Sequence, residues 1–368
     1  MTQGADYKNA KRYSRIRHNL ALFEIGLTLI FLLIVQFSGL SHRLASFAAF
    51  FSSKQIIIIA IYAVCFSSFY NLFIFWLDYF GGFKLEHRFG LSRQSLLSWL
   101  KDYIKKILIG GLFYLIIIEA LYFFLRNFPR TWWMWATLFY LFFSLFLAKI
   151  FPVFIIPLFY KLEVLKDESL RSSLLNLAKK ARIKILDIYR LGLGAKTKKA
   201  NAALTGIGAS KRILLSDTLL GNYSSEEIEA TLAHELAHYK YRHFWKLILT
   251  NLALTVLAFL SVFVVYNLTL KNIIAVEIYD ISAFPVLAFI FLLFNIVVTP
   301  LQNAISRYFE SQADAEAIRL TGRPLAFISL MEKLTRQNLS DPTPSKIVEI
   351  FFYDHPPAAK RIKAAKGS

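Results

Sequence analysis

Six long apolar stretches constrain this chain of 368 residues more than any other feature. Each can cross a hydrocarbon core of about 30 Å as one α-helix, which takes roughly 20 apolar residues. The stretches are residues 20–40, 55–77, 107–125, 132–159, 244–270 and 283–304. With 56% hydrophobic residues and a mean hydropathy of +0.48, the chain has too much apolar surface for an ordinary soluble domain. The sequence therefore predicts an α-helical polytopic membrane protein with six transmembrane helices.

Basic residues predict how these helices are oriented. They cluster before the first stretch and after the second, at Lys8, Lys11, Arg12, Arg15, Arg17, Lys84, Arg88, Arg93, Lys101, Lys105 and Lys106. The alternate loops hold few, so the positive-inside rule places both termini and residues 161–243 in the cytoplasm. The same clusters account for the formal net charge of +19. They favour contact with anionic lipid headgroups and argue against a nucleic-acid partner.

A metal-binding pattern lies between the fourth and fifth stretches. It consists of His234, Glu235 and His238. Histidines four residues apart share one face of a helix, so both imidazoles can bind one zinc ion, and the glutamate can take a proton from zinc-bound water. Ser224 and Glu227 have the spacing of a capping box, and no glycine or proline follows before His243. The pattern is therefore expected on a helix, as the chemistry requires.

A zinc hydrolase needs a third protein ligand, and several residues are candidates. His243 lies five residues after His238, which on a continuous helix turns it roughly 140° away, so it can join the site only if the helix breaks. Glu310, just past the sixth stretch, is the better candidate. Asp314 shares its helical face, so one can bind zinc while the other accepts a hydrogen bond from a ligand histidine. The chemistry alone leaves two further candidates, Glu316 and Glu332.

Residues 161–243 are predicted to form mixed structure. A charged helix is expected at 167–181, followed by short strands at 188–191, 200–205 and 212–215. These strands would form a small β-sheet beside the metal helix. The run Asn201-Ala202-Ala203 is a candidate edge, to which a substrate backbone can add as an extra strand. A plain structural hairpin is the alternative.

Further motifs surround the metal pattern. Glu310 and Asp314 follow a span, and Tyr353-Asp354-His355-Pro356-Pro357 with Arg361 lies near the C-terminus. The other motifs are Leu85-Glu86-His87-Arg88-Phe89-Gly90, Lys105-Lys106, Pro157-Leu158-Phe159, Asn201-Ala202 and the run from Arg212 to Leu220. Together they resemble the type I CAAX prenyl proteases, which are integral-membrane zinc metallopeptidases. The resemblance runs from the second span to the end of the chain.

The resemblance implies a role for each matching residue. The implied zinc ligands are His234, His238 and Glu310, and the implied general base is Glu235. It also implies that Asp314 orients a ligand histidine, and that His355 and Arg361 lie near the developing oxyanion. The implied substrate-holding strand contains Asn201 and Ala202. Two departures are Ala203, where the family has an aromatic residue, and the count of six spans, because eukaryotic members have seven and the first of theirs is missing here.

These observations predict an integral-membrane zinc metalloendopeptidase with one zinc ion per chain. Four transmembrane helices are expected in 1–160, the cytoplasmic insert with the sheet and metal helix in 161–243, two more transmembrane helices in 244–304, and C-terminal cytoplasmic helices with the third ligand in 305–368. The compact form favours a bacterial inner membrane over the endoplasmic reticulum. Expected partners are membrane lipid and a peptide or protein substrate, prenylated or membrane-associated. The alternatives are a quality-control protease similar to the heat-shock peptidases and a transporter, which would explain the spans but not the metal pattern.

Overall fold

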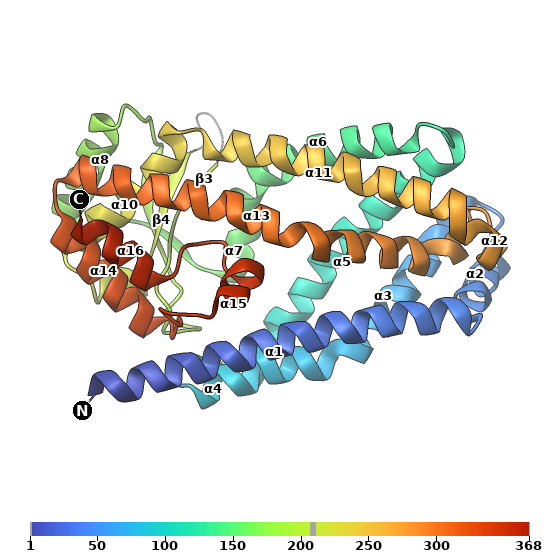
Figure 1. Cartoon of the computed structure of the whole chain (residues 1–368), viewed down its shortest axis with the longest axis horizontal. Helices are drawn as coiled ribbons and strands as arrows, with labels where there is room; N and C mark the ends of the chain where they lie inside the picture. Colours follow the sequence, from blue (N-terminus) through green and yellow to red (C-terminus); the bar gives the residue numbers. More distant parts are fainter. Residues whose placement is uncertain (1, 207–210, 368) are drawn as a thin grey trace.

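The computed structural model describes residues 2–206 and 211–367, and it confirms the six expected spans. The long helices are α1 (Thr2–Phe37), α3 (Gln55–Tyr79), α5 (Leu96–Asn127), α6 (Trp132–Ile150), α11 (His243–Val265) and α13 (Phe284–Thr321). Helical turns continue three of them: η1 (Phe80–Lys84) and α4 (Leu85–Arg88), η2 (Phe151–Ile155) and α7 (Ile156–Phe159), and η4 (Tyr266–Leu270) and α12 (Lys271–Ile274). The molecule is elongated along these helices, with a small sheet at one end (Figure 1).

Shorter helices complete the chain. They are α2 (Leu40–Phe51), α8 (Glu168–Lys180), α9 (Asp217–Leu220), α10 (Ser225–Lys240), η5 (Ile281–Ala283), α14 (Pro324–Gln337), α15 (Lys346–Phe352) and α16 (Ala358–Lys366). The helix predicted at 167–181 is confirmed as α8. The sequence did not predict α2, because its 12 residues are too few to span a membrane. The start of α1 and all of α16 lie at the sheet end of the molecule (Figure 1).

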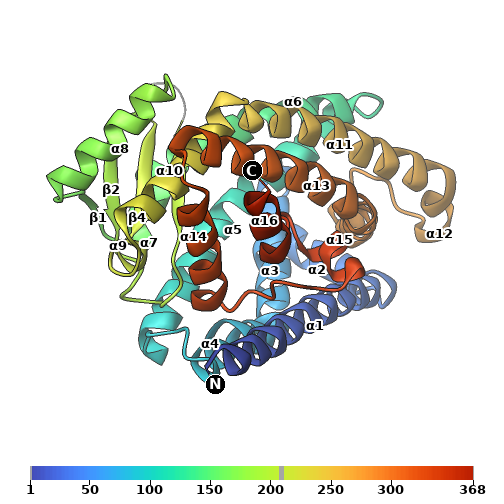
Figure 2. The same ribbon diagram turned by 60° about the vertical axis from the view of Figure 1, so that its left-hand side comes forward.

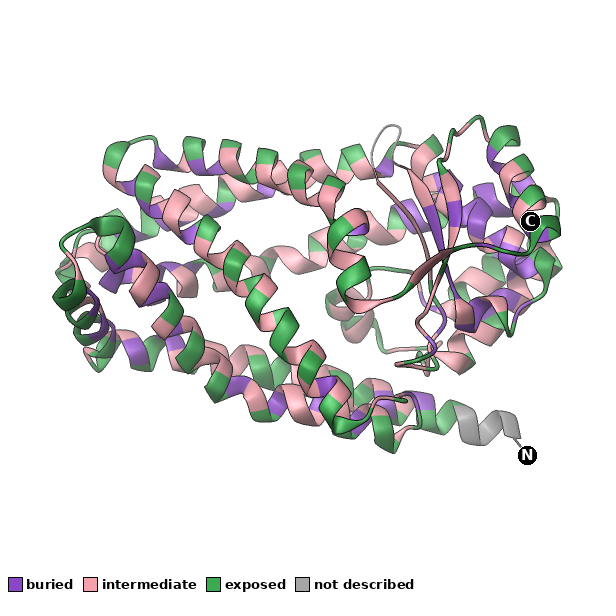
Figure 3. Ribbon diagram, turned by 180° about the vertical axis from the view of Figure 1, so that it is seen from behind, coloured by how far each residue is buried: buried purple, intermediate pink, exposed green. Residues whose placement is uncertain are grey.

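The spans differ in how much of their surface the protein itself covers. In the most apolar 18-residue window, 39% of the residues of the last span are buried, against 6–22% for the other five. The other five therefore direct most of their apolar side chains outward, as helices that face lipid do, while more of α13 is covered by helices such as α11, beside which it runs (Figure 2). At the end away from the sheet, the spans are joined by a buried cluster that includes Tyr62, Tyr122, Trp132 and Tyr266 (Figure 3).

The sheet has four strands in the order β1-β2-β4-β3. They are β1 (Leu162–Val164), β2 (Asp187–Leu191), β3 (Ala202–Thr205) and β4 (Arg212–Ser216). β2 and β4 pair in parallel, and the outer pairs are antiparallel. The three predicted strands are confirmed, whereas β1, with only three residues, was not predicted. β3 lies at one edge of the sheet, as proposed for the run that begins at Asn201, and it packs against α10.

The sixth span and the residues beyond it form one helix. The sixth apolar stretch was expected to end at residue 304, but α13 has 38 residues and ends at Thr321, where the next residue, Gly322, adopts a left-handed φ of 66°. Pro300 lies inside α13 without ending it. Glu310 and Asp314 are therefore carried on the same helix that crosses the apolar region.

The helix that holds the metal pattern is shorter than expected. It ends at Lys240, and Arg242 adopts a left-handed backbone conformation with φ 56° before α11 begins at His243. The chain turns sharply there, so the expected uninterrupted helix up to His243 is wrong.

Candidate metal centre

The start of α10 is fixed by the predicted capping box. The Glu227 N–H donates to Oγ of Ser224, and the Ser224 N–H donates to the Glu227 carboxylate at 2.8 Å. The Glu227 carboxylate is buried and also accepts hydrogen bonds from Lys333 and Ser329 of α14. These bonds satisfy backbone N–H groups that have no partner within the helix, and they attach the start of α10 to α14. They fix the position of α10, and with it the position of the metal pattern.

The three predicted ligands converge on one point. Their ligand atoms all lie within 4.8 Å of one another. The Nε2 atoms of His234 and His238 are 3.1 Å apart, and the Glu310 carboxylate oxygens lie 3.1 Å and 3.3 Å from them. Tetrahedral zinc with bonds of about 2.0–2.1 Å places its ligand atoms about 3.3 Å apart. In addition, the buried Oε2 of Glu310 has no aligned hydrogen-bond donor among the described residues. Two imidazoles and one carboxylate at these separations fit a zinc ion.

The other side of His234 faces a buried carboxylate. Its Nδ1 lies 2.9 Å from Oδ1 of Asp314, which in turn accepts two hydrogen bonds from Arg361 at 2.5 and 2.7 Å. Burial alone would lower the pKa of His234, but the carboxylates of Asp314 and Glu310 raise it to about 9. The centre thus stabilises positive charge, which a metal cation requires. The Nε and Nη2 of Arg361 face Asp314, and the expected place of Arg361 near an oxyanion stays a prediction.

His243 lies beside His238 because the helix breaks. Its Nδ1 is 3.0 Å from Nδ1 of His238, on the side of that ring away from the other ligands. The sequence showed that His243 could join the site only after a break, but nothing in the run from Lys240 to His243 indicated one, since it contains no glycine or proline. Sequence reasoning also missed Gln312, whose Oε1 lies 3.1 Å from Nε2 of His243.

The two alternative third ligands lie outside this group. Glu316 is buried, and its carboxylate is bound by Lys240, Tyr241 and Arg319. Glu332 is exposed on α14. Of the carboxylates that the sequence left open, Glu310 is the one whose oxygens lie near both histidines.

Glu235 faces the edge of the sheet. Its Oε2 accepts a hydrogen bond from the Leu204 N–H of β3 at 3.2 Å. The Asn201 backbone instead points toward β4. Its N–H donates to Oγ of Ser216 and its carbonyl accepts from the Ser216 N–H, both at 2.9 Å. Backbone groups alternate in direction along a strand, so those of Ala202 and Leu204 point outward from β3. The free edge and the Glu235 carboxylate therefore share one space.

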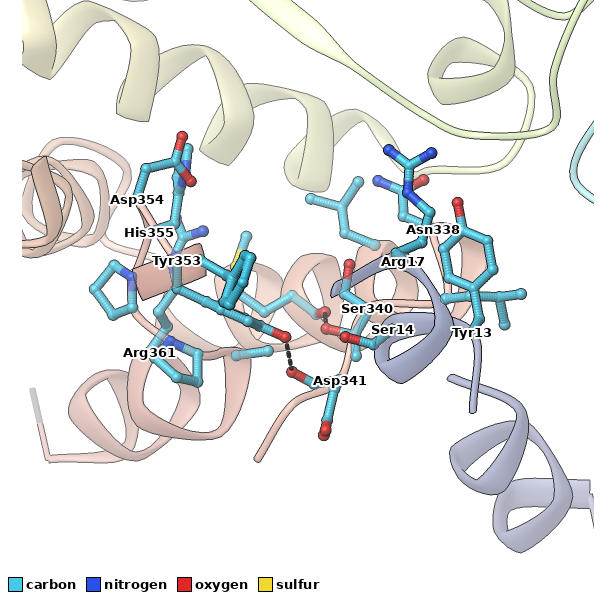
Figure 4. Close-up of a pocket in the computed structure, with 18 of the residues that line it drawn as sticks. Tyr13, Ser14, Arg17, Asn338, Ser340, Asp341, Tyr353, Asp354, His355 and Arg361 are labelled. Carbon is cyan, nitrogen blue, oxygen red and sulfur yellow. Dashed lines mark hydrogen bonds and ion pairs between the residues drawn. The ribbon is translucent and has the colours of Figure 1, made fainter. Parts of the chain in front are cut away.

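His355 approaches the centre from the loop between α15 and α16. Its Nε2 is 3.4 Å from Oε2 of Glu310, and its Nδ1 is 2.8 Å from Oδ1 of Asp354. Burial lowers the pKa of His355, but the hydrogen bond to Asp354 and the charge of Glu310 more than offset this and raise it. His355 and Arg361 line a cavity of about 490 Å³ that extends to Tyr13 and Arg17 of α1 (Figure 4). Of the predicted substrate-holding residues, Ala202 is the first residue of β3 and Asn201 directly precedes it.

Two family models match nearly the whole chain. The model of peptidase family M48 matches residues 164–368, and a model described as the CAAX prenyl protease N-terminal region with five membrane helices matches residues 1–161. CAAX prenyl protease 1 of Saccharomyces cerevisiae is 32% identical, over 78% of this chain and 67% of that protein. An uncharacterized metalloprotease of Bacillus subtilis, YhfN, is 29% identical, over 97% of this chain and 84% of that protein.

A solved structure shares the same architecture. The crystal structure of Ste24p from S. mikatae matches with a TM-score of 0.85 at 25% sequence identity. The match covers 98% of this chain and 89% of the other. The similarity therefore includes the membrane helices as well as the sheet and the metal centre.

Proposed function

The chain belongs to peptidase family M48 and is a multi-pass membrane metalloprotease related to the CAAX prenyl proteases, and we propose that it hydrolyses peptide bonds with one zinc ion per chain. The proposed ligands are His234, His238 and Glu310. The observation that carries the proposal is the convergence of their ligand atoms within 4.8 Å, beside Glu235. A catalytic zinc site has three protein ligands and an open fourth position, and this donor set leaves one.

Glu235 is the proposed general base. When bound, zinc lowers the pKa of a water molecule and polarises the scissile carbonyl. The Glu235 carboxylate lies between the metal ligands and the β3 edge, so it can take a proton from water that attacks a backbone held on that edge. The same carboxyl group can then deliver the proton to the leaving nitrogen. Its present hydrogen bond to the Leu204 N–H shows that the carboxylate reaches the edge.

The substrate is proposed to bind β3 as an added strand. Among the described residues β3 pairs only with β4, so the outward backbone groups of Ala202 and Leu204 can pair with an extended peptide, with the Leu204 N–H exchanging its bond to Glu235 for one to the peptide. The Asn201 backbone is bound to Ser216, which fixes the start of the edge. An extended peptide here would run past Glu235, so its backbone would be presented to the base.

His355 is proposed to stabilise the transition state. Asp354 accepts a hydrogen bond from Nδ1, and the raised pKa of His355 favours the imidazolium, whose Nε2–H can donate to the developing oxyanion. Because Arg361 is bound to Asp314, its proposed contribution is first to hold the carboxylate that orients His234. Direct contact of Arg361 with the oxyanion stays a prediction.

The substrate is a peptide or protein, and we propose that it carries a prenyl or similar apolar group. The names of the relatives support this, and so does an apolar cavity of about 520 Å³ next to β3. Ala203 lines it, opposite Ile109 and Phe113 of α5. Ala203, which stands where the family resemblance implies an aromatic residue, leaves that cavity open. Cleavage of a prenylated peptide and of the same peptide without the group, measured with the same purified protein, tests this choice. Equal rates would favour a general quality-control protease.

We also propose that the metal centre faces the cytoplasm of a bacterial inner membrane. Support comes from the basic residues, which cluster at the sheet end, in the first turns of α1 and around α4. Labelling of single cysteines placed at Glu226 and at Ser52, in intact cells and in inverted vesicles, tests the orientation. Glu226 should be reached only in inverted vesicles and Ser52 only in intact cells.

The zinc assignment is tested by metal analysis of Glu310→Ala. This variant should bind zinc much more weakly than the wild-type protein, because a zinc site with two protein ligands is incomplete. Glu316→Ala is the matched control, since it removes a buried carboxylate of the same helix that lies outside the metal group. Unchanged zinc content in Glu310→Ala with loss in Glu316→Ala would move the third ligand to Glu316.

A further inference from the structure

The break between α10 and α11 brings a third histidine against the metal centre. On a continuous helix His243 would lie roughly 140° around the axis from His238. Arg242 instead takes a left-handed conformation, φ 56°, which turns the chain so that the two Nδ1 atoms lie 3.0 Å apart. A left-handed conformation is costly for a residue with a β-carbon, so the surrounding structure must compensate for it. His243, which is 1% exposed, is the residue that the turn buries.

The position of the hydrogens follows from the proposed metal binding. Nε2 of His238 lies among the ligand atoms, so it must keep its lone pair for the metal, and the proton of the neutral ring is then on Nδ1. That N–H faces Nδ1 of His243 at 3.0 Å, so this nitrogen is the acceptor. The proton of His243 is consequently on its Nε2, and this N–H donates to Oε1 of Gln312 at 3.1 Å. The Gln312 amide then donates to Oη of Tyr308 at 3.0 Å.

Two aromatic rings pack against the ring of His243. Phe309 stacks on it with a centroid distance of 4.5 Å and an interplanar angle of 11°. Tyr241 also stacks on it, at 5.7 Å and 21°. Phe309 precedes Glu310 in α13, and Gln312 lies two residues after it. The helix that carries the proposed third ligand thus also fixes the ring that contacts the second ligand.

We propose that His243 is a positioning residue for the metal centre: it accepts the Nδ1 proton of His238, and so fixes the plane and the tautomer of that ring. This inference rests on the proposed function, since it assumes that His238 binds the metal through Nε2. His238 is then supported by a neutral ring, whereas His234 is supported by the Asp314 carboxylate. A neutral acceptor orients the ring without adding a negative charge to a centre that already contains Glu310. Partners of this kind typically contribute 10- to 100-fold to metal affinity.

Two substitutions at position 243 separate the hydrogen bond from the packing. In His243→Asn the amide oxygen can replace Nδ1 as the acceptor, whereas His243→Phe keeps a stacked ring but leaves the His238 N–H without a partner. We expect zinc affinity, measured by competition with a chelator, to fall on the order of 10- to 100-fold in His243→Phe and at most about threefold in His243→Asn. The visible spectrum of the cobalt(II)-substituted protein should change in His243→Phe and stay close to that of the wild-type protein in His243→Asn.

Two substitutions at Gln312 test the same hydrogen bonds without changing His243, and they serve if a His243 variant does not fold. Gln312→Leu removes the acceptor of the His243 Nε2–H, and Gln312→Glu keeps it at the same length. Gln312→Leu should weaken zinc binding about three- to tenfold, because the His243 Nε2–H loses its acceptor. Gln312→Glu should weaken zinc binding less, because a carboxylate oxygen can still accept this hydrogen bond. The thermal midpoint of each metal-free variant controls for packing.

Two results would overturn the proposal. One is wild-type zinc affinity with an unchanged cobalt spectrum in both His243→Phe and Gln312→Leu. The other is equal loss of affinity in His243→Phe and His243→Asn, which would assign the effect to shape and not to the hydrogen bond. If the wild-type protein itself binds no zinc, the proposed function fails with it, and that outcome is distinguished by the wild-type measurement alone.

Discussion

The two sides of the metal centre are built in opposite ways. On the side of the ligands, the side chains of His234, Glu310 and Asp314 are only 8–11% exposed, and both ring nitrogens of His234 lie within 3.1 Å of a carboxylate oxygen. On the side where a substrate would bind, the side chain of His355 is 50% exposed, and β3 is an edge strand of the sheet that the described residues form. The buried side is suited to holding a cation, and the open side is suited to exchanging protons and peptides. Metal retention and hydrolysis should therefore respond to different substitutions.

The largest effect is expected for Glu235→Gln, on the open side. The amide keeps the size of the side chain but cannot take a proton, so kcat should fall on the order of 10²- to 10⁴-fold while zinc content stays at the wild-type level. Glu226→Gln, an exposed change on the same helix, is the control and should be silent. Loss of zinc in Glu235→Gln would mean that a change on the open side also affects metal retention. Retained activity would exclude Glu235 as the general base.

His355→Ala tests the same side at a second position. Because the proposed hydrogen bond forms mainly in the transition state, kcat should fall roughly 10- to 1,000-fold, with KM and zinc content nearly unchanged. His18→Ala is a matched control, since His18 lines the same cavity from α1. An effect on KM alone would place His355 in substrate binding, and wild-type kinetics would remove it from the site.

Asp314→Asn examines the buried side. It keeps the shape of the carboxylate but removes the charge that faces His234 and Arg361, so zinc affinity should fall about 10- to 100-fold. Activity per bound zinc should change much less than affinity does. Glu316→Gln, which disturbs another buried ion pair of α13, should lower stability but leave zinc affinity unchanged. A loss of activity per bound zinc as large as that in Glu235→Gln would contradict the separation of the two sides.

The smallest effect is expected for Ala203→Phe, which alters neither the metal nor the proton transfer. The added ring would fill the apolar cavity beside β3, so kcat/KM for a peptide with a bulky apolar group should fall several-fold relative to one with a small group. Val164→Phe, at the opposite edge of the sheet, is the control. The same loss for both peptides would show that residue 203 affects the edge itself and not the cavity.

Much of the buried side could be predicted because its signals are local. Helical periodicity places His234 and His238 on one face, the capping box predicts where α10 begins, and Glu310 and Asp314 share a face of α13. The apolar runs likewise predicted the six spans. The contact of Arg361 with Asp314 joins residues 47 apart in sequence, and no local pattern indicates it.

His243 shows why the rest could not be predicted. No glycine, asparagine or proline near Arg242 indicates the left-handed turn there. The turn is accompanied by packing of His243 against Phe309, a residue far along the chain that a local sequence pattern does not include. The same holds for the length of α13: charged residues after position 304 suggested the end of a span, yet a helix can leave the apolar region without ending. In both cases tertiary contacts decided what local preference left open.

Glu310 lies on the same continuous helix that contacts the lipid-facing spans, ten residues beyond Pro300. At 1.5 Å per residue that is a lever arm of about 15 Å, so a tilt of about 5° at the proline would displace Glu310 by roughly 1.3 Å. Helices change tilt when bilayer thickness changes, at a cost of only fractions of a kcal/mol per Å of mismatch. Such a tilt at Pro300 would couple the geometry of the metal centre to the thickness of the surrounding bilayer, so that lipids with longer or shorter acyl chains would act on the centre at a distance.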